Sequence, residues 1–68
     1  MNDTANDQDV IRKSYEAAVD QLFTIFYGVY TLALTNNDNA ARTHAEDAFR
    51  VGISHARLSR DRAIALLP

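Results

Sequence analysis

The chain has 68 residues, of which 47% are apolar and 24% charged, with two glycines, one proline and no cysteine. This length accommodates a single small domain. Without cysteine the chain has no disulfide, thiolate zinc site, iron–sulfur cluster or cysteine nucleophile. One core of this size supplies only about 3 to 5 kcal/mol, so we expect the missing stability to come from association with another chain.

The net charge is −2, from seven basic and nine acidic residues. Proteins that bind nucleic acid through phosphate contacts usually carry a domain-wide basic excess, which this chain lacks. The N-terminal segment MNDTANDQD contains no basic residue, so we predict no secretory signal. The longest uncharged apolar-rich run, Leu22 to Thr35, has 14 residues, short of the ~20 that cross a bilayer. These features predict a cytoplasmic protein without a membrane partner.

The first half of the chain predicts a polar leader followed by a long helix. Residues 1–8 have no apolar rhythm and are expected to be a flexible, acidic leader that ends in an N-cap. From about residue 9 to 35 apolar residues recur at steps of three and four, which is typical of a helix. The stripe that shows this spacing is Ile11, Tyr15, Ala18, Leu22, Ile25, Val29 and Leu32. A second stripe beside it consists of Val19, Phe23, Phe26, Tyr30 and Ala33.

The segment 36–39, Asn-Asn-Asp-Asn, predicts a tight turn. Asparagine tolerates the left-handed backbone that ends one helix, and Asn or Asp caps the next. A second helix is predicted from about residue 40 to 67, ended by Pro68. So short a loop makes the helices antiparallel, and residues whose numbers sum to about 75 then lie at the same height. The predicted fold is all-α, a two-helix antiparallel hairpin that forms one domain over residues 9–68.

The two helices carry more apolar surface than one seam between them covers. Small residues recur along the second helix, which allows the backbone of the first helix or of a second copy to approach closely; they are Ala41, Ala45, Ala48, Gly52, Ala56, Ser59 and Ala63. Exposed apolar surface marks an interaction site, so we predict a homodimer in which two hairpins form a four-helix bundle. The alternative is that a different protein covers the same surface. The predicted interface residues are Leu22, Phe23, Phe26, Val29, Tyr30, Ala45, Ala48, Phe49, Gly52, Ile53 and Ala56.

A second contact surface is predicted at Tyr27 and Gly28. Glycine in the middle of a helix costs about 1 kcal/mol relative to alanine, which a close backbone approach would explain. Tyr27 projects toward the polar side of the same helix. The two residues are therefore expected to meet a bundle neighbour or a partner helix.

Residue patterns that form catalytic or metal-binding sites in other proteins are rare in this sequence. Its serines lie within predicted helices and lack the glycine-framed elbow of a nucleophile. His44 and His55 are separated by about 16 Å along one helix, too far to share a metal ion within the chain. We therefore predict a non-enzymatic protein with no catalytic, cofactor or metal site. A carboxylate/histidine metal-binding bundle is kept as an alternative.

The arginines of the second helix are the remaining candidate contact. They are Arg50, Arg57, Arg60 and Arg62. Acidic residues between them favour a solvated surface. A dimer, however, would carry two sets of these arginines, which could bind a partner protein or nucleic acid. In topology alone the predicted dimer resembles the Rop-like family of helical hairpins, which implies a nucleic-acid-binding alternative. The predicted function is a small protein–protein interaction or regulatory module that acts as a homodimer.

Overall fold

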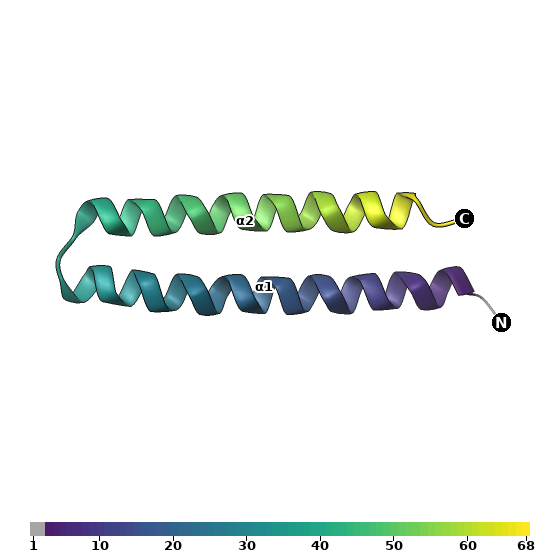
Figure 1. Cartoon of the computed structure of the whole chain (residues 1–68), viewed down its shortest axis with the longest axis horizontal. Helices are drawn as coiled ribbons and strands as arrows, with labels where there is room; N and C mark the ends of the chain where they lie inside the picture. The colour runs from purple at the N-terminus through teal and green to yellow at the C-terminus, as the bar shows by residue number, and fades with distance from the viewer. Residues whose placement is uncertain (1–2) are drawn as a thin grey trace.

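The computed structural model describes residues 3–68 as two α-helices that run antiparallel and side by side (Figure 1). Helix α1 spans Asp3–Thr35 and helix α2 spans Asn39–Ala65. The Cα atoms occupy 55 × 15 × 7 Å, so the molecule is a single layer of helices. The predicted all-α hairpin is confirmed.

The turn between the helices uses the side chains and backbone conformations that the sequence predicts. Asn37 has a φ of 54°, and its N–H donates to the carbonyl of Leu34 at 3.1 Å. The N–H of Asp38 donates to the carbonyl of Ala33 at 2.9 Å, which completes a Schellman motif at the end of α1. Asp38 is also the N-cap of α2, because its Oδ1 accepts from the N–H of Ala41 at 3.0 Å.

The outer ends of both helices differ from their predicted positions. Helix α1 begins at Asp3, so residues 3–8 are helical, while residues 1 and 2 of the predicted leader lie outside the described residues. An apolar rhythm marks a buried face, so the polar residues of an exposed first turn carry no such signal, and the acidic side chain of Asp3 suits the N-terminus of the helix. Helix α2 ends at Ala65 because Pro68 disfavours helical backbone at Leu67, the residue before it.

The register of the hairpin follows the predicted pairing of residues. The ring centroids of Phe26 and Phe49 lie 5.0 Å apart, and the Arg60 guanidinium lies 4.4 Å from the centroid of the Tyr15 ring. Both pairs have numbers that sum to about 75, as expected for a tight turn near residue 37. At the open end of the hairpin, the Thr4 hydroxyl donates to the Pro68 carbonyl at 3.0 Å.

The seam between the helices buries little. Among the described residues only Ala33 and Ala45 are buried, at 3% and 5% exposure. The predicted stripe of α1 departs from the seam beyond Leu22, where Ile25, Val29 and Leu32 are exposed and the partly buried Phe26 and Tyr30 take over. A strict seven-residue repeat drifts by about 20° per heptad around a straight helix, so a stripe that starts in the seam ends beside it.

At Gly52, the small residues of α2 face α1 across the seam of the same hairpin. A Cβ atom at Gly52 would lie 2.7 Å from Cδ2 of Leu22, so this glycine makes room for that side chain in the seam. Ala45 is buried in the same seam. The first of the two predicted uses of the stripe, close approach of α1, is therefore seen at these positions.

The two glycines yield a paired prediction about stability. A Cβ at Gly28 meets nothing within 4 Å, so Gly28→Ala should stabilise the protein by about 1 kcal/mol through helix propensity. Gly52→Ala should gain less, because Leu22 has to move. Urea unfolding of the two variants beside the wild type measures both effects. An equal gain would contradict the packing of Leu22 on Gly52, and a loss at Gly28 would indicate that a partner packs there.

Candidate interaction surface

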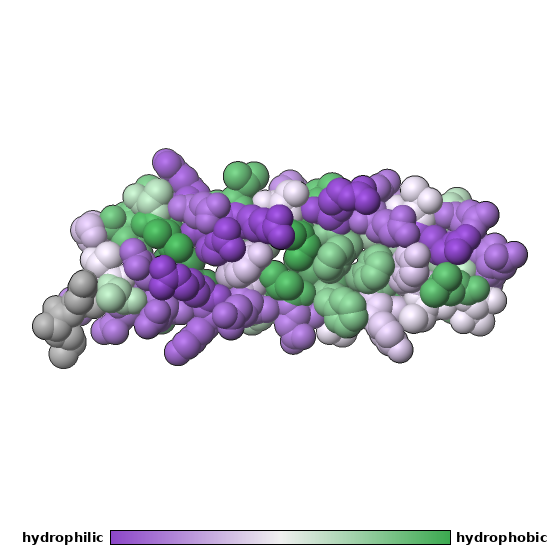
Figure 2. Space-filling model, turned by 180° about the vertical axis from the view of Figure 1, so that it is seen from behind, coloured by the Kyte–Doolittle hydropathy of each residue, from purple (hydrophilic) through white to green (hydrophobic). Residues whose placement is uncertain are grey.

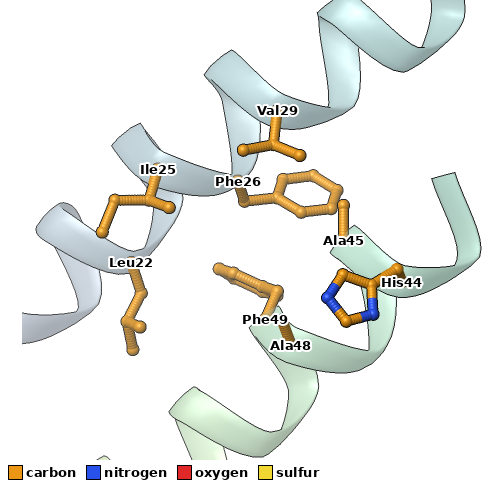
Figure 3. Close-up of a pocket in the computed structure, with 8 residues that line it drawn as sticks. All are labelled: Leu22, Ile25, Phe26, Val29, His44, Ala45, Ala48 and Phe49. Atoms are coloured by element: carbon orange, nitrogen blue, oxygen red, sulfur yellow. The ribbon is translucent and has the colours of Figure 1, made fainter. Parts of the chain in front are cut away.

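Two grooves between the helices lie on the same side of the hairpin. Groove 1, of about 250 Å³, is nearer the turn and is lined by Leu22, Ile25, Phe26, Val29, His44, Ala45, Ala48 and Phe49. Figure 3 shows the rings of Phe26 and Phe49 between the helices, with the imidazole of His44 on α2. Groove 2, of about 400 Å³, is nearer the termini and is lined by Val10, Ile11, Ser14, Tyr15, Ala18, Ala56, Ser59, Arg60 and Ala63.

The residues that line grooves 1 and 2 form one long surface, which we call the apolar face. Ile11, Ala18, Ile25 and Val29 are separated by steps that return to one side of α1 at 100° per residue. Among the described residues that line grooves 1 and 2, Arg60 is the only arginine, and none is Asp, Glu or Lys. Its Nε donates to Asp61 Oδ1 at 2.9 Å, and this hydrogen bond raises the pKa of Arg60.

The opposite side of the hairpin is the charged face, defined by the residues of groove 3. This groove, of about 350 Å³, is lined by Phe26, Glu46, Phe49, Arg50, Ile53, Ser54 and Arg57. Figure 2 shows this side of the molecule, where hydrophilic side chains run along both helices and border a hydrophobic patch. Arg50 Nη1 also donates to Asp47 Oδ1 at 2.9 Å, so neighbouring charges are partly paired. The two faces therefore differ strongly in charge.

An aromatic cluster near the turn fastens the helices to each other. Phe26 stacks on Tyr30 with 4.8 Å between ring centroids and also contacts Phe49 on α2. The Tyr30 hydroxyl donates to Glu46 Oε2 at 3.0 Å. This hydrogen bond raises the pKa of Tyr30, with partial desolvation and the charge of Glu46 acting in the same direction and Arg42 opposing them. The cluster joins both helices through apolar and polar contacts at once.

The predicted interface residues do not all lie on one face of the hairpin. Most of them line grooves 1 and 2, namely Leu22, Phe26, Val29, Ala45, Ala48, Phe49 and Ala56, and two of these, Phe26 and Phe49, also line groove 3. Gly52 lies in the seam against Leu22, Ile53 lines groove 3 on the charged face, and Tyr30 bonds to Glu46. Phe23 is 52% exposed, and its position on α1 places it toward the side of Tyr30, away from Ile25.

Sequence reasoning did not include Ile25, Leu32 or Val10 in the interface. All three are large apolar side chains with more than half of their surface exposed, at 57%, 61% and 62%. Ile25 and Leu32 belong to the stripe of apolar residues whose spacing predicts the first helix. The signal that would have separated them from the seam is the heptad drift, which moves the later members of that stripe to one side.

The predicted second contact is solvent-facing in the hairpin. Tyr27 is 60% exposed, and its ring centroid lies 6.1 Å from that of Phe23. A Cβ at Gly28 would face open space. The hairpin itself therefore does not explain this glycine, and a contact with another molecule stays a prediction.

The four arginines of α2 are distributed over different parts of the surface. Arg50 and Arg57 line groove 3, and Arg60 lines groove 2. Arg62 is exposed in the last turn of α2. Arg50 and Arg60 already pair with Asp47 and Asp61. The structure therefore brings together only Arg50 and Arg57 as a shared arginine site.

Two further features bear on metals and membranes. Within residues 3–68, no three His, Asp or Glu side chains are grouped closely enough to hold one metal ion. Helix α1 is long and apolar enough to cross a membrane by length and composition, with a mean hydropathy of 1.3 over its most apolar 18-residue window. An amphipathic helix that packs in a bundle meets the same criteria, so the predicted location stays a prediction.

Comparisons with protein-family models, with curated proteins and with solved structures found no match.

The bond between Tyr30 and Glu46 predicts a pH effect. Because the folded pKa of Tyr30 is raised, the bond contributes stability below the ordinary tyrosine pKa of about 10, and this contribution is lost as the pH rises through the raised value. Glu46→Ala should lower the pKa of Tyr30 toward its ordinary value. Tyrosinate absorbance in a Tyr15→Phe/Tyr27→Phe background reports Tyr30 alone. Asp47→Ala is the matched control, and an equal effect of both variants would contradict the assignment.

Proposed function

We propose that this chain is a non-enzymatic protein–protein interaction module whose working form is a homodimeric four-helix bundle. The observation that carries the proposal is the exposure of large apolar side chains along a single layer of helices. Ile25, Leu32 and Leu58 are 57%, 61% and 67% exposed, and the described seam buries only two alanines. Helices form stable domains by burying an apolar stripe against a second layer, which one hairpin does not supply.

The accessible surface of the hairpin supports the same proposal. It amounts to 5199 Å², whereas a folded monomer of 7.6 kDa is expected to expose about 4,300 Å². The excess of roughly 900 Å² is close to the ~800 Å² that each partner buries in a standard protein–protein interface. A second hairpin therefore has the right size to complete the missing layer.

The other functional candidates have weaker support in the described residues. A nucleic-acid-binding surface needs clustered basic residues, and the arginines of α2 are divided between two faces and partly paired with carboxylates. A metal-binding bundle would have to draw its ligands from more than one copy. A regulatory role would use the bundle surface to bind a further protein, and the charged face is the part of the hairpin that a dimer through the apolar face leaves accessible.

The solution mass of the protein tests the proposal directly. Sedimentation equilibrium at micromolar concentration should give twice the chain mass of 7.6 kDa, and the melting temperature should rise with protein concentration because dimer formation is coupled to folding. A species of 7.6 kDa with a cooperative melt that is independent of concentration would contradict the dimer.

A further inference from the structure

We propose that the second copy docks on the apolar face, with its α2 lying across α1 of the first copy, so that both turns lie at the same end of the bundle. The inference rests on the proposed homodimer and specifies which face forms it and in which orientation. It concerns the residues that line grooves 1 and 2, together with Leu32, which follows Ile25 and Val29 on the same side of α1.

The charge difference between the faces selects the apolar one. Docking through groove 3 would remove Glu46, Arg50 and Arg57 from water, and charged groups lose solvation that imperfect pairing does not restore. Docking through grooves 1 and 2 involves one arginine, Arg60, and no Asp, Glu or Lys among the lining residues, and Arg60 already lies over Tyr15 and bonds Asp61. The apolar face therefore has the smaller cost of desolvation.

The dimensions of this face fit a second copy. The Cα atoms of the two helices outline a rectangle 55 Å long and 15 Å wide, roughly 800 Å² in projection, which is of the same order as the accessible area that one partner buries in a standard interface. A copy of this hairpin has the same outline and the same two grooves. A contact along the whole length would cover Val10, Ile25 and Val29, which are otherwise between 47% and 62% exposed.

The distribution of large and small side chains selects the orientation. On the apolar face α1 contributes large side chains such as Ile11, Ile25 and Val29, while α2 contributes mostly small ones. These are Ala48, Ser59 and Ala63, with the larger His44 at the turn end. Packing is densest when large side chains face small ones. If α1 lay on α1 of the second copy, large side chains would oppose large ones, and the two α2 helices would oppose each other across a gap. With α1 on α2, Ile25 lies near Ala48 of the second copy.

The two ways of packing the helices differ in the distance between the two turns of the dimer. A two-fold axis parallel to the helices places α1 on α2 of the second copy and keeps both turns at one end. A two-fold axis perpendicular to the helices places α1 on α1 and puts the turns at opposite ends of the bundle. Every neighbouring pair of helices is antiparallel in both cases, so the position of the turns distinguishes them.

Two matched substitutions on α1 test the face. Ile25→Glu introduces a charge on the apolar face, and Phe23→Glu introduces the same charge on the other side at a similar exposure, 57% against 52%. We expect Ile25→Glu to weaken the dimer Kd at least 100-fold and Phe23→Glu to change it less than threefold. Ala48→Glu and Ser54→Glu form the corresponding pair on α2. Circular dichroism at equal concentrations establishes whether each variant retains its helices.

The outcomes of this experiment separate the two proposals. A wild-type dimer that tolerates Ile25→Glu and Ala48→Glu but dissociates with Phe23→Glu overturns the apolar face and leaves the homodimer intact. A monomeric wild-type chain overturns the homodimer itself. A wild-type chain that is monomeric and co-sediments with phosphatidylcholine vesicles would assign the apolar face to a lipid surface and overturn both.

A distance measurement on an otherwise intact dimer tests the orientation. The chain has no cysteine, so Asn36→Cys places one spin label per copy in the turn without altering the left-handed Asn37. If both turns lie at the same end, their backbones are separated by about 10 Å, one interhelical spacing. The length of the label side chains adds to this distance. Turns at opposite ends would be separated by nearly the 55 Å length of the hairpin, and a distance of that order overturns the proposed orientation.

Discussion

A single layer of two helices has no interior, so every buried contact within the hairpin has to form along the line where the helices meet. Each helix touches its neighbour along one line, so a side chain that leaves the line by a quarter turn meets solvent. The two residues that are buried among those described, Ala33 and Ala45, are small and lie in the seam at the turn end. Large side chains such as Phe26 are only partly covered. A second layer is therefore the physical requirement from which the proposed dimer follows.

The seam itself is made from specific contacts rather than from a continuous core. Near the turn, Phe26 packs between Tyr30 and Phe49, and Glu46 accepts the Tyr30 hydroxyl. In the terminal half, Arg60 lies over the ring of Tyr15. These contacts set the register of the helices and, with it, the residues that face each side. The separation of an apolar face from a charged face is thus a consequence of how the seam is aligned.

Most of the fold was predictable because its signals are local. The Asn and Asp residues of the turn act through their own backbone conformations and side chains, as Asn37 and Asp38 do here. The outer helix ends were less predictable, since exposed polar residues such as those after Asp3 have no apolar rhythm and still form a helix. The predicted interface and the proposed apolar face share Leu22, Phe26 and Val29 but not Ile25, because a seven-residue stripe followed without its drift of about 20° per heptad stays in the seam.

Helix propensity, capping and loop length act over a few neighbouring residues, and for that reason the all-α hairpin, its tight turn and its antiparallel register can be predicted from the sequence. The packed hairpin is needed to show which apolar residues lie between the helices and which remain exposed. That choice depends on the angle at which α1 meets α2 along its whole length. A drift of about 20° per heptad is enough to move Ile25, Val29 and Leu32 out of the seam and onto an exposed face.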